Sequence, residues 1–495
     1  MDKRVIEKFA VSARKQLIED IGLRLEQLGI DENGASDKED RSTREAEFYA
    51  NQTKPLTGAE IGWRQAIVNR LAKTAKNDQW ATAYTDLVEE VAYTWFNRII
   101  AIRFMEVNDY LPSHVRVLSS IEGRNEPDIM TEALDISEYL GDFTAAEKQV
   151  YDDAWAAQVP AKMDKLYRML FLKQIDALNE NLPKLFEKTD DYMKLLFTPS
   201  YNNGVIKTLV TEVPEADFDV EKEGQVEIIG WLYQYYNEEP HNQVVNINGG
   251  PVKKNDIPAA TQLFTTDWVV RYMVDNSLGR FYLEHNEQST IADKLKYLLP
   301  GKLVQSEDTI ELKKIKVLDN AMGSGHILVY AFDVLMEMYL EQGYSKRDAA
   351  VSIIQNNLYG LEIDRRAYQL AYFALMMKLR QYHRRALTME IVPNIYVFED
   401  TDDITVEDIN SWNVSETAKK DLAEIANEFS NARTLGSIIK MYRSFDIPSL
   451  KKELSNAVSK TDLDVFAIDR KINVLSNTLN IVQLFQTKFE VLKPM

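Results

Sequence analysis

The fold is decided by the stretch Val317-Leu318-Asp319-Asn320-Ala321-Met322-Gly323-Ser324-Gly325-His326. Its first residues are typical of a short apolar strand, and an apolar helical pattern begins at His326. Two glycines between a strand and a helix let the backbone approach a ligand closely, with the amides at the helix start facing it. The loop lacks a third glycine and a Gly-Lys-Ser/Thr sequence, so dinucleotide and P-loop interpretations lose support.

Strands and helices alternate around this loop. The pattern predicts strands at 315–318, 357–363 and 391–398, with helices at 326–340 and 367–379, and a further helix near 345–355 in the first crossover. This alternation is typical of a parallel α/β sheet, so we expect an α/β fold.

The chain before this region has a different pattern. Apolar residues recur at helical spacing from Val5 to Leu28 and again in several later stretches, which predicts a helical domain over residues 1–240. Residues 241–257 are rich in Asn, Pro, Gly and Lys without apolar periodicity and are expected to form a linker. Residues 258–495 are then the α/β domain, which becomes helical again from Glu416.

Composition narrows the class of protein. The 495 residues are 45% hydrophobic and 27% charged, as in globular proteins, and no apolar run is long enough to span a membrane. We therefore expect a cytoplasmic protein without a membrane partner. Absence of cysteine excludes thiolate chemistry, and five histidines without helical pairing disfavour a catalytic metal site. A net charge of −19 argues against a protein that coats phosphates unspecifically.

Three groups of residues allow two interpretations each. Arg98 and Arg103, within an apolar helix, could contact phosphate, but pairing inside a helical bundle is favoured. The aromatic cluster at 231–236 could stack on unpaired bases, but a place in the core is favoured. His326 could act as a general base, but a place in the pocket wall or at the helix start is favoured.

Two carboxylates at strand ends suggest a cofactor. Asp319 could accept hydrogen bonds from an amine while the glycine amides bind a carboxylate, a combination that suits an amino acid. Glu362, at the end of the second strand, could hold the hydroxyls of an adenosine ribose. An amino-acid end and a ribose end together predict S-adenosylmethionine. The alternative is that both acids only cap their strand ends.

Residues 319–328 resemble the D-P-A-C-G-S-G-x-F-L motif of adenine-specific DNA methyltransferases. Leu361-Glu362-Ile363-Asp364 is similar to the next motif of that family, and residues 260–273 resemble the segment that covers the methionine end. The resemblance implies an S-adenosylmethionine-dependent, Rossmann-like methyltransferase domain that follows an N-terminal all-helical domain.

The resemblance also implies a role for each cofactor-site residue. On the methionine side it places Gln262, Phe264 and Thr265. The loop beneath would contain Asp319, Ala321, Gly323 and Gly325. Glu362 would bind the ribose, Ile363 would pack on the adenine ring, and Asp400 would accept a hydrogen bond from the adenine amino group.

Together with residues 95–106 and 229–236, these motifs resemble the PglX family of BREX phage-defence methyltransferases. The resemblance implies adenine N6 methylation of double-stranded DNA that marks the host, alongside other defence proteins. Asn320 and Met322 stand where the family has proline and cysteine. The chain has no Pro-Pro pair and hence no N-P-P-Y loop, which in the family holds the flipped adenine.

We therefore expect the N-terminal portion of such an enzyme, with a partial methyltransferase domain that binds the cofactor but does not methylate by itself. The alternative is a noncatalytic scaffold or regulatory subunit that binds partner proteins through its helical domain.

Overall fold

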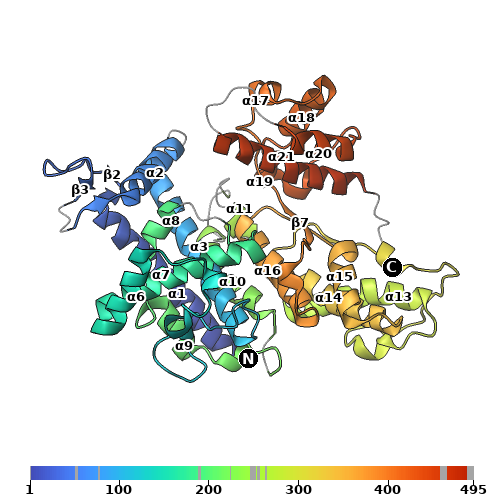
Figure 1. Cartoon of the computed structure of the whole chain (residues 1–495). Helices are drawn as coiled ribbons and strands as arrows, with labels where there is room; N and C mark the ends of the chain where they lie inside the picture. Colours follow the sequence, from blue (N-terminus) through green and yellow to red (C-terminus); the bar gives the residue numbers. More distant parts are fainter. Residues whose placement is uncertain are drawn as a thin grey trace. The chain divides into compact units, whose positions relative to one another are not determined.

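The chain forms two compact units, Met1–Glu239 and Pro240–Met495, in the computed structural model (Figure 1). The structure describes residues 2–50, 54–75, 79–187, 191–222, 225–245, 252, 257–261, 265–457 and 465–487. Among the helices in these ranges, none is both long enough and apolar enough to cross a bilayer.

The first unit is built mainly of helices. The long ones are α1 (Lys3–Gln27), α2 (Ala59–Thr74), α3 (Trp80–Val107), α6 (Ala145–Ala157), α7 (Pro160–Asn181), α9 (Gly204–Glu212) and α10 (Ile228–Val244). Shorter helices are α4 (Asp128–Glu132), α5 (Ser137–Leu140) and α8 (Asp191–Leu196). The helix predicted from Val5 to Leu28 is confirmed as α1, which packs on α3.

Helix α3 is buried on nearly all sides from Val91 to Glu106, and its two arginines are paired inside the unit. Arg98 donates to the carbonyl oxygen of Glu187 at 3.0 Å. Arg103 donates to Glu106 at 2.7 Å, and both side chains are fully covered. Residues Trp231, Tyr233 and Tyr236 of α10 are buried too. The structural interpretations of the arginines and of the aromatic cluster are therefore confirmed.

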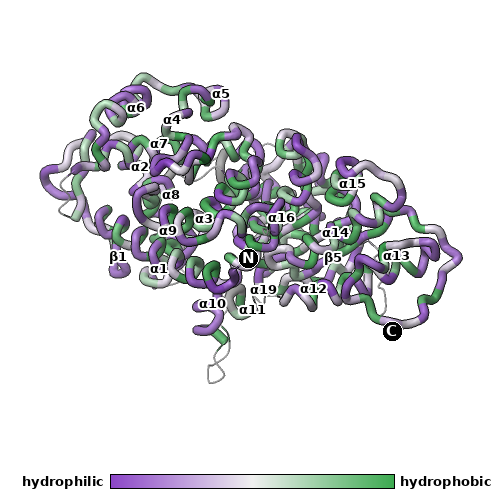
Figure 2. Tube along the Cα trace, turned by 90° about the horizontal axis from the view of Figure 1, so that it is seen from below, coloured by the Kyte–Doolittle hydropathy of each residue, from purple (hydrophilic) through white to green (hydrophobic). Residues whose placement is uncertain are grey.

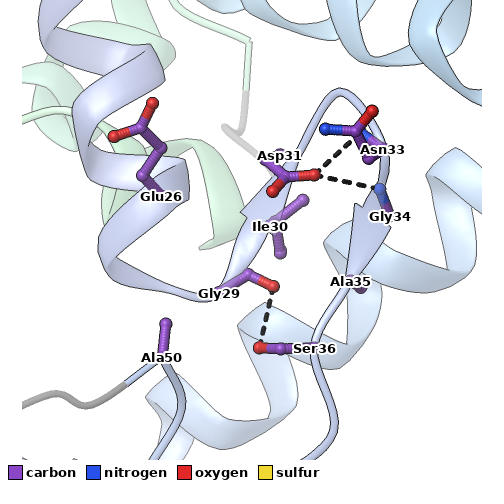
Figure 3. A pocket seen from close by; sticks show the side chains of 9 residues that line it. All are labelled: Glu26, Gly29, Ile30, Asp31, Asn33, Gly34, Ala35, Ser36 and Ala50. Carbon is purple, nitrogen blue, oxygen red and sulfur yellow. Dashed lines mark hydrogen bonds between the residues drawn. The ribbon is translucent and has the colours of Figure 1, made fainter.

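A short hairpin follows α1. Strands β1 (Ile30–Asp31) and β2 (Gly34–Ala35) pair antiparallel, and one carboxylate oxygen of Asp31 accepts from the amides of Asn33 and Gly34 (Figure 3). A second two-residue pair joins β3 (Ala46–Glu47) to β4 (Leu56–Thr57). Strands this short have no sequence periodicity, so they were not predicted.

The predicted linker begins too early. Helix α10 continues through Pro240 to Val244, so residues 241–244 are helical. Pro240 removes one backbone donor from the helix without ending it. Residues 246–251 and 253–256 of that prediction lie outside the described residues, and α11 (Ile257–Thr261) follows them.

The second unit contains a parallel sheet of three strands in the order β5 (Val317–Asp319), β6 (Leu358–Glu362) and β7 (Asn394–Val397). Helices α14 (His326–Glu341) and α15 (Lys346–Ser352) connect the first two strands, and α16 (Arg365–Tyr382) connects the last two. The predicted alternation is confirmed. Strands β6 and β7 are shorter than predicted at both ends, whereas β5 begins two residues later and ends one residue later than predicted.

Helices cover both faces of this sheet. Helices α14 and α16 are rich in apolar residues (Figure 2). Both helices contact β6 and each other, so they cover one face of the sheet. The other face meets a helical layer made of α17 (Val406–Ser411), α18 (Glu416–Glu428), α20 (Ile447–Ser455) and α21 (Val465–Gln486). Leu361 and Phe398 belong to the core of that layer. The sheet is therefore the middle of three layers.

Two further short helices, α12 (Asp267–Val274) and α13 (Arg280–His285), precede the sheet, and α12 packs against α14. A last one, α19 (Ala432–Leu435), continues into a single 3₁₀ turn, Gly436–Ile438.

Candidate cofactor site

The glycine loop between β5 and α14 requires both of its glycines. Gly323 and Gly325 have φ angles of +55° and +84°, which side-chain-bearing residues rarely adopt. A Cβ atom on Gly325 would also lie 3.0 Å from Cβ of Ala371 in α16. Gly325 therefore lets the start of α14 pack closely on α16, and no side chain caps that helix start.

Asp319 ends β5 with one oxygen held and the other without a partner. Its Oδ1 accepts from the amide of Ala321 at 3.2 Å, whereas Oδ2 is buried and has no hydrogen-bond partner among the described residues. Burial raises the pKa of Asp319, partly offset by the Ala321 amide. A buried oxygen without a donor costs free energy, and an ammonium group placed there would remove that cost.

Glu362 ends β6 and holds the glycine loop. Its Oε2 accepts from the amide of Gly323 at 2.7 Å, and its Oε1 accepts from the amides of Ile363 and Asp364 at 2.9 Å each. Its side chain is only 8% exposed, and burial raises its pKa to about 7 despite these amides. The three amides use three of about four acceptor positions of the carboxylate. Room remains for one hydroxyl donor rather than the two expected for a ribose clamp.

Asp319 and Glu362 lie on the same face of the sheet. Asp319 pairs with Gly360 in the parallel register, and Glu362 is two residues further along β6. Side chains alternate along a strand, so the side chains at 319, 360 and 362 point to one side. The spacing of strands and residues puts the two Cα atoms about 8 Å apart, short enough for one small molecule to contact both carboxylates.

Met322 is buried beside Gly360, on the same face of the sheet as the two carboxylates. It is 4% exposed, and its Sδ atom occupies the space where a Cβ of Gly360 would lie. The same Cβ would be 2.9 Å from Leu328 and from Ile395. Gly360 therefore provides the room for a residue longer than cysteine in the loop.

The segment expected on the methionine side is only partly described. Thr265 is half-buried and lies two residues before α12, whereas Gln262 and Phe264 lie outside the described residues. Asp267, the first residue of α12, has its Oδ1 atom 3.8 Å from Nε2 of His326 at the start of α14. This contact brings the chain around Thr265 to the glycine loop, and it places His326 at the helix start with 8% exposure.

The residues after the three strands meet the α19 segment, here residues 432–438. The side chain of Ile363 lies against Gly436, whose Cβ would be 3.0 Å from Cγ2 of Ile363. Asp400 accepts from the amide of Arg433 at 2.9 Å. The hydroxyl of Ser437 donates to the carbonyl oxygen of Asn320. The structure thus gives Ile363 and Asp400 protein contacts along the edge where the adenine was expected.

Two residues at this edge were not predicted from the sequence. Gly360 gave no signal, because its role depends on Met322, which the fold brings from another segment. Asp364 caps α16 by accepting from the amide of Arg366 at 2.9 Å, and an acid just before a helical pattern was an available signal. Burial raises the pKa of Asp364, but Arg366 lowers it below its ordinary value.

Comparisons with known proteins find DNA methyltransferases that are similar to this chain. Residues 301–472 match the family described as MmeI, DNA-methyltransferase domain. Over 92% of its length the chain is 47% identical to adenine-specific methyltransferase PglX of Lacticaseibacillus casei (strain Zhang), covering 39% of that protein. It is 36% identical to adenine-specific methyltransferase BrxX of Escherichia coli O9:H4 (strain HS), over 81% of this chain and 33% of the relative. The chain thus spans between a third and two fifths of these relatives.

Proposed function

Because the chain is PglX-like in sequence and contains a methyltransferase domain, we propose that it forms the cofactor-binding part of an adenine-specific DNA methyltransferase. The three described strands then correspond to one half of a Rossmann-like sheet. In support, β5 lies at the edge of the described sheet, where its backbone could pair with a further strand.

The observation that carries the proposal is the pair of carboxylates on one face of the sheet above a glycine loop. Asp319 would bind the ammonium group of S-adenosylmethionine through its buried, unpartnered oxygen. Glu362 would accept one ribose hydroxyl while it keeps the loop in place through Gly323. The cofactor supplies the methyl group that is transferred.

The remaining roles follow from the same proposal. Thr265 would lie beside the methionine end, with Gln262 and Phe264 preceding it in the chain. Ile363 would contact the adenine ring of the cofactor, and Asp400 would accept a hydrogen bond from its amino group. Both residues contact the α19 segment in the structure, so that segment would have to move for the adenine to bind there.

The substrate would be adenine in double-stranded DNA, methylated at N6 to mark host DNA in a phage-defence system with other defence proteins, in the cytoplasm. A flipped adenine needs acceptors for its amino group and an aromatic face. The chain contains no Pro-Pro pair that could form the N-P-P-Y loop. We therefore expect this chain alone to bind S-adenosylmethionine without methylating DNA.

Isothermal titration of the chain with S-adenosylmethionine tests the proposal. Asp319→Asn and Glu362→Gln should each weaken binding roughly tenfold or more, because each removes a charge-assisted hydrogen bond. Glu287→Gln makes the same kind of change at an exposed position of this unit and should leave the affinity unchanged. No heat of binding, or equal affinity in all variants, would instead favour the noncatalytic scaffold.

A further inference from the structure

A basic hollow lies at the opposite end of the sheet from the proposed cofactor site. Its volume is about 610 Å³, and its lining includes Lys313, Arg347, His383 and Arg385 with a single acidic residue, Asp348. Lys313 lies before β5, Arg347 lies in the first turn of α15, and His383 and Arg385 follow the end of α16. β6 has five residues, so the hollow is about 16 Å from the glycine loop.

The charge of this hollow is opposite to that of the chain. The whole sequence carries −19 with histidine counted as neutral, so three cationic side chains around one concavity, those of Lys313, Arg347 and Arg385, are not explained by overall composition. Nε of Arg347 lies 3.3 Å from Oδ1 of Asp348, which offsets one of the positive charges. Such a cluster attracts anions to the concavity.

The donors of the hollow are accessible. The side chain of Arg347 is 65% exposed, and Arg385 is exposed as well. Nδ1 of His383 accepts from the amide of Arg385 at 3.2 Å, so the ring proton lies on Nε2, which can donate to a ligand. Guanidinium and imidazole donors of this kind bind phosphate oxygens.

The rest of the lining suits an aromatic base better than an extended duplex. Tyr344 borders the hollow and is held edge-on against Tyr339, with ring centroids 4.9 Å apart. Gln355 and Asn356, also in the lining, lie in the single π-helical turn Ile353–Asn357. π-turns often occur at functional sites, and amide side chains can read the edge of a base. The volume is that of a small-molecule site.

We propose that this hollow binds a nucleotide of nucleoside diphosphate size, with the phosphates on the basic side chains and the base near Tyr344. This function is additional to methyl transfer. Because the hollow and the glycine loop are at opposite ends of the strands, both ligands could bind at once.

The test is isothermal titration with ADP in the presence of saturating S-adenosylmethionine. The double variant Arg347→Ala/Arg385→Ala should weaken ADP binding roughly tenfold or more. Lys162→Ala/Lys165→Ala removes the same charge from exposed positions of the first unit and should leave it unchanged. Adenosine and inorganic phosphate, each lacking half of the ligand, should bind more weakly than ADP.

Three results would overturn the proposal. The first is no heat with ADP, or equal ADP affinity in the double variant and its control. The second is displacement of ADP by S-adenosylmethionine, which would place ADP in the cofactor site. The third is a short DNA duplex that competes with ADP and loses affinity in the double variant, which would make the hollow a DNA-backbone contact. The first and third results say nothing about S-adenosylmethionine binding at Asp319 and Glu362, whereas the second would support it.

Discussion

Glu362 should make the second unit less stable as the pH rises. Burial raises its pKa to about 7 in the folded chain, whereas an ordinary glutamate has a value of 4.5. Between these values the folded state holds a proton that the unfolded state has lost, so the stabilising contribution of that proton disappears as pH rises through 7. Between about pH 5 and pH 8 this contribution falls by about 2.5 kcal/mol.

Comparison with Glu362→Gln isolates this effect. The glutamine side chain cannot ionise. Its NH₂ group would face the backbone N–H of Gly323, so the variant loses this hydrogen bond at every pH. The difference in unfolding free energy between wild type and variant should therefore change by about 2.5 kcal/mol over this range, whatever its offset. Urea unfolding at several pH values, followed by circular dichroism, measures it.

The control for this experiment is Glu287→Gln, an exposed position in the same unit. A difference between wild type and Glu362→Gln that stays constant from about pH 5 to pH 8 would refute the reasoning, because it would mean that burial does not hold a proton on Glu362.

Three further substitutions test the packing around the site and, as a contrast, the packing inside the first unit. Gly325→Ala should destabilise the chain by roughly 2–4 kcal/mol in urea unfolding and weaken S-adenosylmethionine binding. The control Gly343→Ala, at the same φ of +84° but in open space, should cost only about 1 kcal/mol. Equal costs for the two variants would contradict the close packing of Gly325 on α16. Gly360→Ala should lower the free energy of unfolding by roughly 1–3 kcal/mol, because the new Cβ would compete with the Met322 side chain for one space. The double variant Gly360→Ala/Met322→Cys should recover most of that stability in thermal unfolding. No recovery would argue against this contact. Glu106→Ala removes a buried carboxylate with four donors and should cost roughly 3–5 kcal/mol in the first unit, with the heat of cofactor binding unchanged.

The sequence predicted the layout of the second unit because each element carries its own periodic signal. The apolar run before Asp319 and the helical pattern after His326 appear as β5 and α14. The residues around Gly325 were also predictable, since a glycine between a strand and a helix has few other uses. The two-residue strand pairs of the first unit carry no such signal.

The contacts of the site residues were not predictable, because they depend on segments distant in the chain. Asp400 meets the amide of Arg433, 33 residues later, and the carbonyl of Asn320 meets Ser437, 117 residues later. Glu362 was expected to face a ligand freely, yet backbone amides take most of its acceptor positions. The local sequence pattern places a carboxylate at a strand end, but it does not show which hydrogen-bond donors the folded chain brings to that carboxylate.

A crystal structure of this chain with S-adenosylmethionine bound would test most directly whether one cofactor molecule contacts both Asp319 at the end of β5 and Glu362 at the end of β6. We expect the cofactor's ammonium group within hydrogen-bond distance of the free oxygen of Asp319 and one ribose hydroxyl within reach of Glu362. Density for the cofactor at any other place, with both carboxylates untouched, would contradict this account.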